Sequence, residues 1–172
     1  MLNTLPFNHS FPPIADNNAR VLILGSMPGV KSLEEQQYYA HPRNAFWPIM
    51  CVLLAMKPEQ DYDKRCQLLV DNHIAVWDVL KACQRQGSLD QAINTASMVA
   101  NDFNLWLQHH SDIQKIVFNG AKAEQVFKRL VLPTLTKQQA AIVRFRLPST
   151  SPAHASSSID AKLGIWRQAL ID

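Results

Sequence analysis

The sequence predicts a single α/β domain built on a parallel sheet with helices on both faces. A chain of 172 residues is long enough for one hydrophobic core. Four short apolar runs rich in β-branched residues predict the strands: RVLILG, IAVWDVL, QKIVFNG and AIVRFRLP. Helical patterns alternate with these runs, which favours right-handed βαβ crossovers and hence parallel strands.

The four predicted strands differ in how deeply they should be buried. The first three runs, at 20–25, 74–80 and 114–120, lack the polar alternation of a half-exposed strand, so we expect both of their faces to be covered. The fourth run, at 141–148, carries Arg144 and Arg146 between apolar neighbours. We therefore place it at an edge of the sheet.

Helices are predicted between and after the strands, within one domain that spans residues 1–172. Asn101 or Asp102 can cap one of them, and the serines of SSSID can cap the last. Residues 1–18 read as an irregular N-terminal extension, and the chain shows no internal repeat. The helical patterns cover residues 44–56, 62–72, 101–110, 121–130 and 158–170.

Composition excludes several classes of protein. The chain is 47% hydrophobic and 18% charged, as expected of an ordinary folded domain, and its net charge of +3 favours a polyanionic partner without identifying one. Cys51, Cys66 and Cys83 contain no C-x-x-C pair, so we expect reduced, buried thiols and no zinc or iron–sulfur site. No signal peptide or membrane-spanning run is evident, so the expected compartment is the cytoplasm with its nucleoid, and no membrane partner is expected.

Polar or turn-forming residues follow every predicted strand. The strand ends are Gly25-Ser26, Asp78, Asn119-Gly120 and Pro148-Ser149. In parallel sheets, ligands bind at the carboxyl ends of the strands, so we expect these residues on one rim. Asn119-Gly120 alone reads as an ordinary turn. The long polar stretches at 25–29 and 148–154 favour a binding site.

The stretch GSMPG follows the first strand. Its glycines allow close backbone approach and Pro28 stiffens the turn, so the loop could aim N–H groups at a base or a phosphate. No Gly-Lys-Ser/Thr follows, and the pattern is not a dinucleotide fingerprint. Taken alone, the stretch is a weak signal.

The stretch HPRNAFW gathers an imidazole, a guanidinium, an amide and two rings where a helix is expected to begin. Asn44 can cap the helix that Ala45 begins, and a capping role does not exclude a catalytic one. Phe46 can offer a ring face for stacking, whereas Trp47 reads as a core residue. His41 reads as structural.

The stretch LPSTSPAHASSS follows the last strand. Ser151, His154 and Asp160 suggest a serine hydrolase, but no G-x-S-x-G elbow is present and the three residues lie close together in one loop. A rigid loop that touches a phosphate backbone through Ser151, Pro152 and His154 fits the composition better.

Taken together, these stretches resemble the uracil-DNA glycosylase superfamily, and within it the hypoxanthine-DNA (deoxyinosine) glycosylase family. The resemblance covers most of the chain, in order, through LILGSMPG, QQYYAHPRNAFWPIM, AVWDVLKACQRQGSLDQAI, NDF, VFNGAKA and LPSTSPAHAS. It implies a three-layer α/β/α sandwich around a four-stranded parallel sheet. It also implies hydrolysis of the N-glycosidic bond of a deaminated base, hypoxanthine or also uracil or xanthine, flipped out of DNA.

The resemblance also assigns roles to residues. It makes Asn44 and Ser149 catalytic and places Gly25, Ser26, Met27 and Phe46 around the base. Asp78, at the end of the second strand, can accept a hydrogen bond from the base or from water, or it can bond neighbouring loops in a structural role. Where several relatives carry Asp or Asn, this chain has Met27, whose thioether cannot orient water. Ser149 stands where many relatives carry His or Asn, which leaves the donor to the departing base open.

The family further implies a monomer without metal or cofactor. No lysine lies in the motifs, Lys31 being the nearest, so we expect a monofunctional glycosylase without Schiff-base chemistry. Two other functions stay open: a module that recognises damaged DNA without cutting it, and a hydrolase of small nucleosides or esters.

Overall fold

The structure, a computed structural model, describes residues 4–58 and 60–172. Its centre is a parallel sheet with the strand order β3-β2-β6-β7. The strands are β2 (Val21–Gly25), β3 (Ile74–Asp78), β6 (Lys115–Asn119) and β7 (Val143–Leu147). The predicted parallel sheet is confirmed, with β7 at its edge as its arginines indicated.

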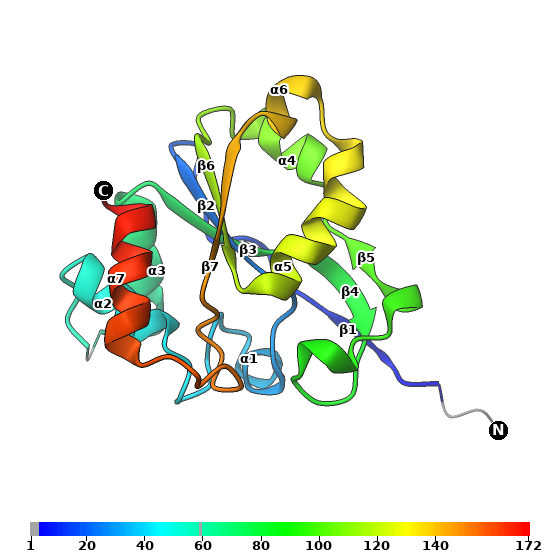
Figure 1. The fold of residues 1–172 in the computed structure, drawn as a ribbon, viewed down its shortest axis with the longest axis horizontal. Coiled ribbons are helices and arrows are strands. Elements are labelled where there is room, and N and C mark those ends of the chain that lie inside the picture. Colours follow the sequence, from blue (N-terminus) through cyan, green and yellow to red (C-terminus); the bar gives the residue numbers. More distant parts are fainter. Residues whose placement is uncertain (1–3, 59) are drawn as a thin grey trace.

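Helices cover both faces of this sheet (Figure 1). On one side lie α2 (Phe46–Leu53), α3 (Tyr62–Asp71) and α7 (Ile159–Leu170). On the other side lie α4 (Phe103–His109) and α5 (Ala121–Val126), with α6 (Lys137–Ala140) above them. The three-layer α/β/α arrangement is therefore confirmed.

The helix ends follow the capping residues that the sequence offers. Asp102 accepts the Leu105 N–H at 3.0 Å to begin α4, and Ser158 accepts the Ala161 N–H at 3.1 Å to begin α7. A π-helical turn at Phe127–Val131 and a 3₁₀ turn at Leu132–Thr134 extend α5. The short helix α1 is Val30–Glu35, and further 3₁₀ turns lie at Asp90–Ala92 and Thr95–Ser97.

A second, antiparallel sheet corrects two expectations, the irregular N-terminal extension and the single strand at 74–80. It contains β1 (Phe7–His9), β4 (Leu80–Gln84) and β5 (Val99–Ala100), in the order β1-β4-β5. The N-terminal extension is therefore not irregular throughout, because β1 pairs with β4 and Ile14 bridges to Val76.

The apolar run 74–80 is not one strand. It leaves the parallel sheet after Asp78 and enters the antiparallel sheet at Leu80. The Val79 and Leu80 N–H groups donate to the carbonyls of Gly25 and Ser26 at 2.8 and 3.1 Å. These bonds draw the chain across the end of β2, which a continuous apolar run does not reveal.

The core lies between the sheet and the helix layers, where Phe46, Phe103, Phe118, Phe127 and Trp166 are fully buried. All three cysteines are free thiols, but only Cys83 is buried as expected, and Cys51 and Cys66 are half-buried. Across residues 4–58 and 60–172, no helix combines the length and apolar character needed to cross a membrane.

Candidate active site

A cavity of about 310 Å³ opens at the carboxyl ends of the parallel strands. Three segments that lie far apart in sequence meet there: α1 with its preceding turn, the loop after β4 and the loop after β7 (Figure 1). Nine of the ten predicted site residues line the cavity, and Phe46 does not. The nine are Gly25, Ser26, Met27, Asn44, Asp78, Ser149, Ser151, Pro152 and His154.

The turn after β2 forms one wall and needs glycine at its first position. A Cβ on Gly25 would lie 2.5 Å from Asp78 Oδ1 and 3.2 Å from the Tyr39 hydroxyl. The Gly25 and Ser26 carbonyls are already used by the β3–β4 connection, and Ser26 Oγ donates to Asp90 Oδ1 at 2.5 Å. These hydrogen bonds fix the turn against the β3–β4 connection and the loop that carries Asp90.

A buried arginine that the sequence reasoning missed supports this turn. Arg85 donates through Nη2 to the Pro28 carbonyl and through Nε to the Gly87 carbonyl. The Val30 N–H donates to Ser88 Oγ at 2.8 Å, which fixes the start of α1 to the same loop. Arg85 lies in the stretch KACQRQGSLDQAI, but no residue pattern in that stretch indicates that its side chain supports another loop.

Asp78 ends β3 and forms the floor between the turn and Tyr39. It is 3% exposed, and its Oδ2 has no hydrogen-bond partner in the described part of the chain. The pKa of this carboxyl is raised to about 7, chiefly by burial and also by the nearby Asp90 carboxylate, while the charge of Arg85 opposes the rise. Near neutral pH the carboxyl is thus poised between donating and accepting a hydrogen bond.

The aromatic wall of the cavity is Tyr39, which corrects the expectation for Phe46. Phe46 is fully buried, and its ring stacks behind Tyr39 with centroids 4.1 Å apart and planes 25° from parallel. Tyr39 itself lines the cavity. Tyr38 lines the cavity as well but is only 3% exposed, and neither tyrosine was singled out from the sequence.

Tyr39 is held in an unusual conformation. Its φ of 54° lies in the left-handed region, which costs a non-glycine residue on the order of 1 kcal/mol or more. Its hydroxyl is buried without a hydrogen-bond partner among the described residues, and burial together with the Asp78 charge raises the pKa of this phenol. The tyrosine is therefore neutral at any ordinary pH.

Asn44 also lines the cavity. Its Oδ1 accepts the Phe46 N–H at 2.9 Å, and Ala45 is the N-cap, so α2 begins one residue later than expected. This bond fixes which end of the amide is oxygen and leaves Nδ2 as a donor. His41 Nδ1 accepts the Arg43 N–H at 3.1 Å, but His41 also lines the cavity, so the structural role expected for it stays a prediction.

Thr150 joins three segments around the cavity. Asn119 Nδ2 donates to Thr150 Oγ1 at 2.8 Å, and the Thr150 N–H donates back to Asn119 Oδ1 at 2.9 Å. The Thr150 carbonyl accepts the Ala45 N–H at 3.0 Å. Asn119 thus does more than form a turn, because it holds the loop after β7 against the start of α2.

The loop after β7 is fastened at both ends by α7. Trp166 Nε1 donates to the Pro148 carbonyl at 3.1 Å, and the buried Lys162 donates to the His154 carbonyl at 2.7 Å. Inside the loop, Ser149 Oγ accepts the Ser151 N–H at 3.2 Å. The Ser149 hydroxyl proton therefore remains free to be donated into the cavity.

The geometry gives no support to a serine hydrolase. Ser151 Oγ accepts the Ala153 N–H at 3.3 Å, and no hydrogen bond found within the described residues joins Ser151, His154 and Asp160. Nor does any group of three His, Cys, Asp or Glu side chains gather as a metal site in the part of the chain that the structure describes. The expected lack of metal and cofactor stays a prediction.

A lysine does reach the rim of the cavity. Lys31 is one of the lining residues, and its Nζ pairs with Glu35 at 2.9 Å. The hydrogen bond to Glu35 raises the pKa of the amine, so the amine is protonated at neutral pH. A protonated amine is not a nucleophile.

These features define a class of protein. The family model of the uracil DNA glycosylase superfamily matches residues 12–169, which is nearly the whole chain. The chain therefore belongs to the uracil DNA glycosylase superfamily.

Its relatives narrow the assignment within the superfamily. Proteins named hypoxanthine DNA glycosylase from Methanosarcina barkeri (strain Fusaro) and Methanosarcina acetivorans are 36% and 38% identical to it over 114 residues, which is 66% of this chain and 71% of each relative. The resemblance to the hypoxanthine DNA glycosylase family indicated by the motifs is thus confirmed.

A solved structure agrees with the fold. A solution NMR structure of a protein from Methanosarcina acetivorans, described as a candidate uracil DNA glycosylase, superposes with a TM-score of 0.75 at 30% identity. The match covers 95% of this chain and 99% of that protein.

Proposed function

We propose that this protein is a DNA glycosylase that hydrolyses the N-glycosidic bond of hypoxanthine, with uracil and xanthine as further candidate substrates. The observation that carries the proposal is the cavity at the strand ends, which gathers a ring, a carboxyl, an amide and a hydroxyl in a space of about 310 Å³. A base inside duplex DNA cannot reach such a cavity, so the target nucleotide must be flipped out.

Tyr39 and Asp78 would hold and read the base. The Tyr39 ring, supported from behind by Phe46, offers a face for stacking. Hypoxanthine and uracil each present a ring N–H beside a carbonyl. The Asp78 carboxyl, with its unpartnered Oδ2 and a pKa of about 7, matches this edge because it can accept from the N–H and, when protonated, donate to the carbonyl. This match accounts for a pocket that takes more than one deaminated base.

Asn44 and Ser149 would assist bond cleavage. In the reaction, water attacks the anomeric carbon, the C–N bond breaks with its electron pair on the base, and the proton lost by the water ends on the departing base. Asn44 Oδ1 has a second lone pair for one O–H of the water, and its Nδ2 can donate to the departing base. The Ser149 hydroxyl is a second donor to that base. Met27 gives no help with water, so positioning by Asn44 carries more of the reaction.

Two features of the cavity bear on DNA contact and on lyase chemistry. Ser151, Pro152 and His154 line the cavity and would meet the phosphate backbone. The amine of Lys31 is paired with Glu35, which supports a monofunctional enzyme that leaves an intact abasic site. We expect a monomer that acts where the cell keeps its DNA.

The test is a strand-scission assay on oligonucleotides with one deoxyinosine, deoxyuridine or deoxyxanthosine. Alkali after incubation should break the strand at the lesion, whereas the same sample without alkali should stay intact. Scission without alkali, or trapping of the protein on DNA by borohydride, would contradict the monofunctional mechanism.

A lesion-binding module without activity is the second candidate, favoured by Met27 at the position where water is expected to be oriented. It predicts retention of the lesion oligonucleotide in a binding assay with no alkali-labile product. Activity on free nucleosides that does not depend on salt would instead indicate a small-molecule hydrolase.

A further inference from the structure

The positive charge of the chain is concentrated in one segment. Residues 121–147 contain six Lys or Arg residues and one acidic residue, a net of five positive charges, whereas the whole chain has a net charge of +3. The rest of the chain therefore carries a net charge of −2. The segment forms α5, its extending turns, α6 and the edge strand β7.

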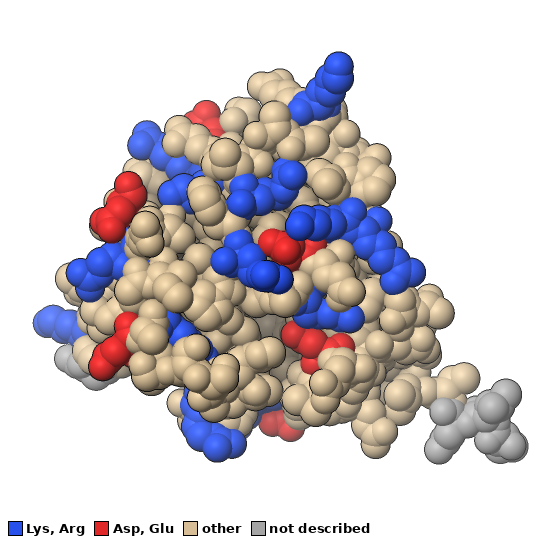
Figure 2. Space-filling model, in the orientation of Figure 1, with Lys and Arg blue, Asp and Glu red and all other residues tan. Residues whose placement is uncertain are grey.

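The segment presents its charge on an exposed surface. Figure 2 shows Lys and Arg side chains gathered over the part of the molecule where Figure 1 places β7 and α5. Arg144 and Arg146 lie two residues apart on β7 and so point to the same side of the sheet. The Arg146 side chain reaches Glu124 of α5, which shows that this is the α5 side.

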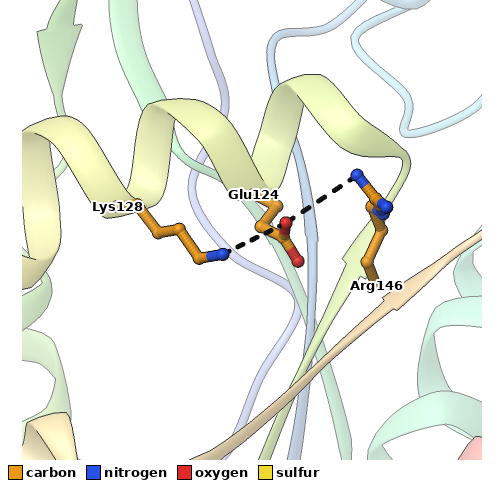
Figure 3. Close-up of polar contacts among 3 residues, drawn as sticks. All are labelled: Glu124, Lys128 and Arg146. Atoms are coloured by element: carbon orange, nitrogen blue, oxygen red, sulfur yellow. Dashed lines mark hydrogen bonds and ion pairs between the residues drawn. The ribbon is translucent and has the colours of Figure 1, made fainter.

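One carboxylate organises these cations. Glu124 Oε1 lies 3.3 Å from Lys128 Nζ and 3.9 Å from Arg146 Nη1 (Figure 3). Lys128 and Arg146 are each 58% exposed, whereas Glu124 is 22% exposed. The carboxylate is thus more buried than the two cations that it pairs with, and the cations are exposed to solvent. We call Lys128, Arg144 and Arg146 the α5–β7 face.

This face is continuous with the rim of the cavity. β7 ends at Leu147, one residue before the loop whose Ser149 lines the cavity, and α5 begins two residues after Asn119, which lines it as well. A polyanion seated at the cavity can therefore extend along β7 and α5 toward Arg146 and Lys128, past Glu124, the one acidic residue of the segment.

We propose that the α5–β7 face binds the phosphate backbone of DNA beyond the flipped nucleotide. Lys128 and Arg146 are the phosphate contacts, and the negative charge of Glu124 beside them lowers the affinity for DNA. The inference rests on the proposed function, since DNA is the partner in both. Arg144 has a supporting role, because its guanidinium already donates to the carbonyls of Ala140 and Ile142. Such contacts fix where the duplex lies and carry no base sequence.

The size of the effect follows from counterion release. Each phosphate contact contributes about 0.9 to the magnitude of the slope of log K, where K is the association constant, against the logarithm of the salt concentration. One contact therefore raises the affinity at 0.15 M salt roughly fivefold relative to the affinity at 1 M salt, where the electrostatic contribution is small. Loss of both contacts in Lys128→Gln/Arg146→Gln should weaken binding to an undamaged duplex of about 30 base pairs by roughly 30-fold and lower the slope by about 2. Glu124→Gln should strengthen binding severalfold.

A matched control separates these contacts from net charge. Arg20→Gln/Arg167→Gln removes the same two charges from exposed positions near the amino end of the sheet, Arg20 before β2 and Arg167 in the last turn of α7. The control should keep duplex affinity within about threefold of the parent protein and keep its salt slope. Circular dichroism of each variant establishes that it is folded.

A second readout separates this inference from the proposed function. Cleavage of a single-stranded hexamer with deoxyinosine, which fills the cavity but does not reach the face, should be unchanged in the Lys128/Arg146 variant. Equal loss of duplex affinity in the control, an unchanged salt slope in the variant, or no duplex binding by the parent protein would each overturn the inference. A parent protein that binds duplex but cleaves no lesion would overturn the proposed function alone.

Discussion

Replacement of Asp78 by asparagine should make the protein more stable at alkaline pH, although it removes a residue from the candidate site. The carboxyl is buried, its Oδ2 lacks a partner, and its pKa is raised from 3.8 to about 7, chiefly by burial. Burial of a charge without a partner is costly, and asparagine carries no charge.

The sign of the pH effect follows from which state binds the proton. Below pH 3.8 the Asp78 carboxyl is protonated in both the native and the unfolded protein, so its titration does not change the free energy of unfolding there. Between pH 3.8 and 7 the unfolded chain releases the proton while the native protein keeps it, so the free energy of unfolding falls as pH rises. Above pH 7 the loss is complete and amounts to at most about 4 kcal/mol, since each unit of pKa is worth about 1.4 kcal/mol.

The assay is urea denaturation of the parent protein and Asp78→Asn at several values between pH 4.5 and 8.5, with the exposed Asp112→Asn as control. The parent and the control should lose stability across this range, and Asp78→Asn should lose less. A parent protein whose stability falls no faster with pH than that of Asp78→Asn would refute the assignment of a buried, proton-binding carboxyl to this position.

Three further substitutions test the cavity. Asn44→Ala should lower the single-turnover rate of cleavage of a deoxyinosine oligonucleotide about 10- to 1000-fold, because a positioned polar group is lost. It should also lower the free energy of unfolding in urea by about 1 kcal/mol, because the bond to the Phe46 N–H is lost. Tyr39→Leu should weaken binding of the lesion oligonucleotide in a titration by roughly 5- to 100-fold, the range of one base–aromatic stack, and an unchanged affinity would exclude Tyr39 as the stacking ring. Gly25→Ala should lose activity in the scission assay, because its methyl group would lie 2.5 Å from Asp78 Oδ1; normal turnover would mean that this wall moves freely.

Much of the fold could be predicted because strand burial and chain order leave strong local signals. The four parallel strands follow from apolar runs, and the edge position of β7 follows from Arg144 and Arg146. The antiparallel sheet could not be predicted in the same way. The break at Val79 depends on hydrogen bonds to Gly25 and Ser26, more than fifty residues earlier, and the seven-residue apolar run carries no mark of it.

The sequence predicts which residues form the candidate site better than it predicts how they are arranged. Strand ends and motifs pointed to Asn44, Asp78 and Ser149, which the fold brings to one cavity. That Tyr39 lines the cavity while Phe46 packs behind it depends on tertiary packing, and aromatic residue types do not encode that choice. The support from Arg85 was likewise hidden, since its partners are main-chain carbonyls that any sequence possesses.

The small antiparallel sheet makes the beginning of the chain matter for chemistry that occurs elsewhere. Asn8 of β1 donates to the Arg85 carbonyl at 3.1 Å, and the Arg85 side chain in turn holds the Pro28 carbonyl beside the cavity. Removal of the first nine residues would thus break the Asn8–Arg85 bond and weaken the support of the glycine turn. A tag is better attached after α7, whose final residues lie at the other end of the sheet from the cavity.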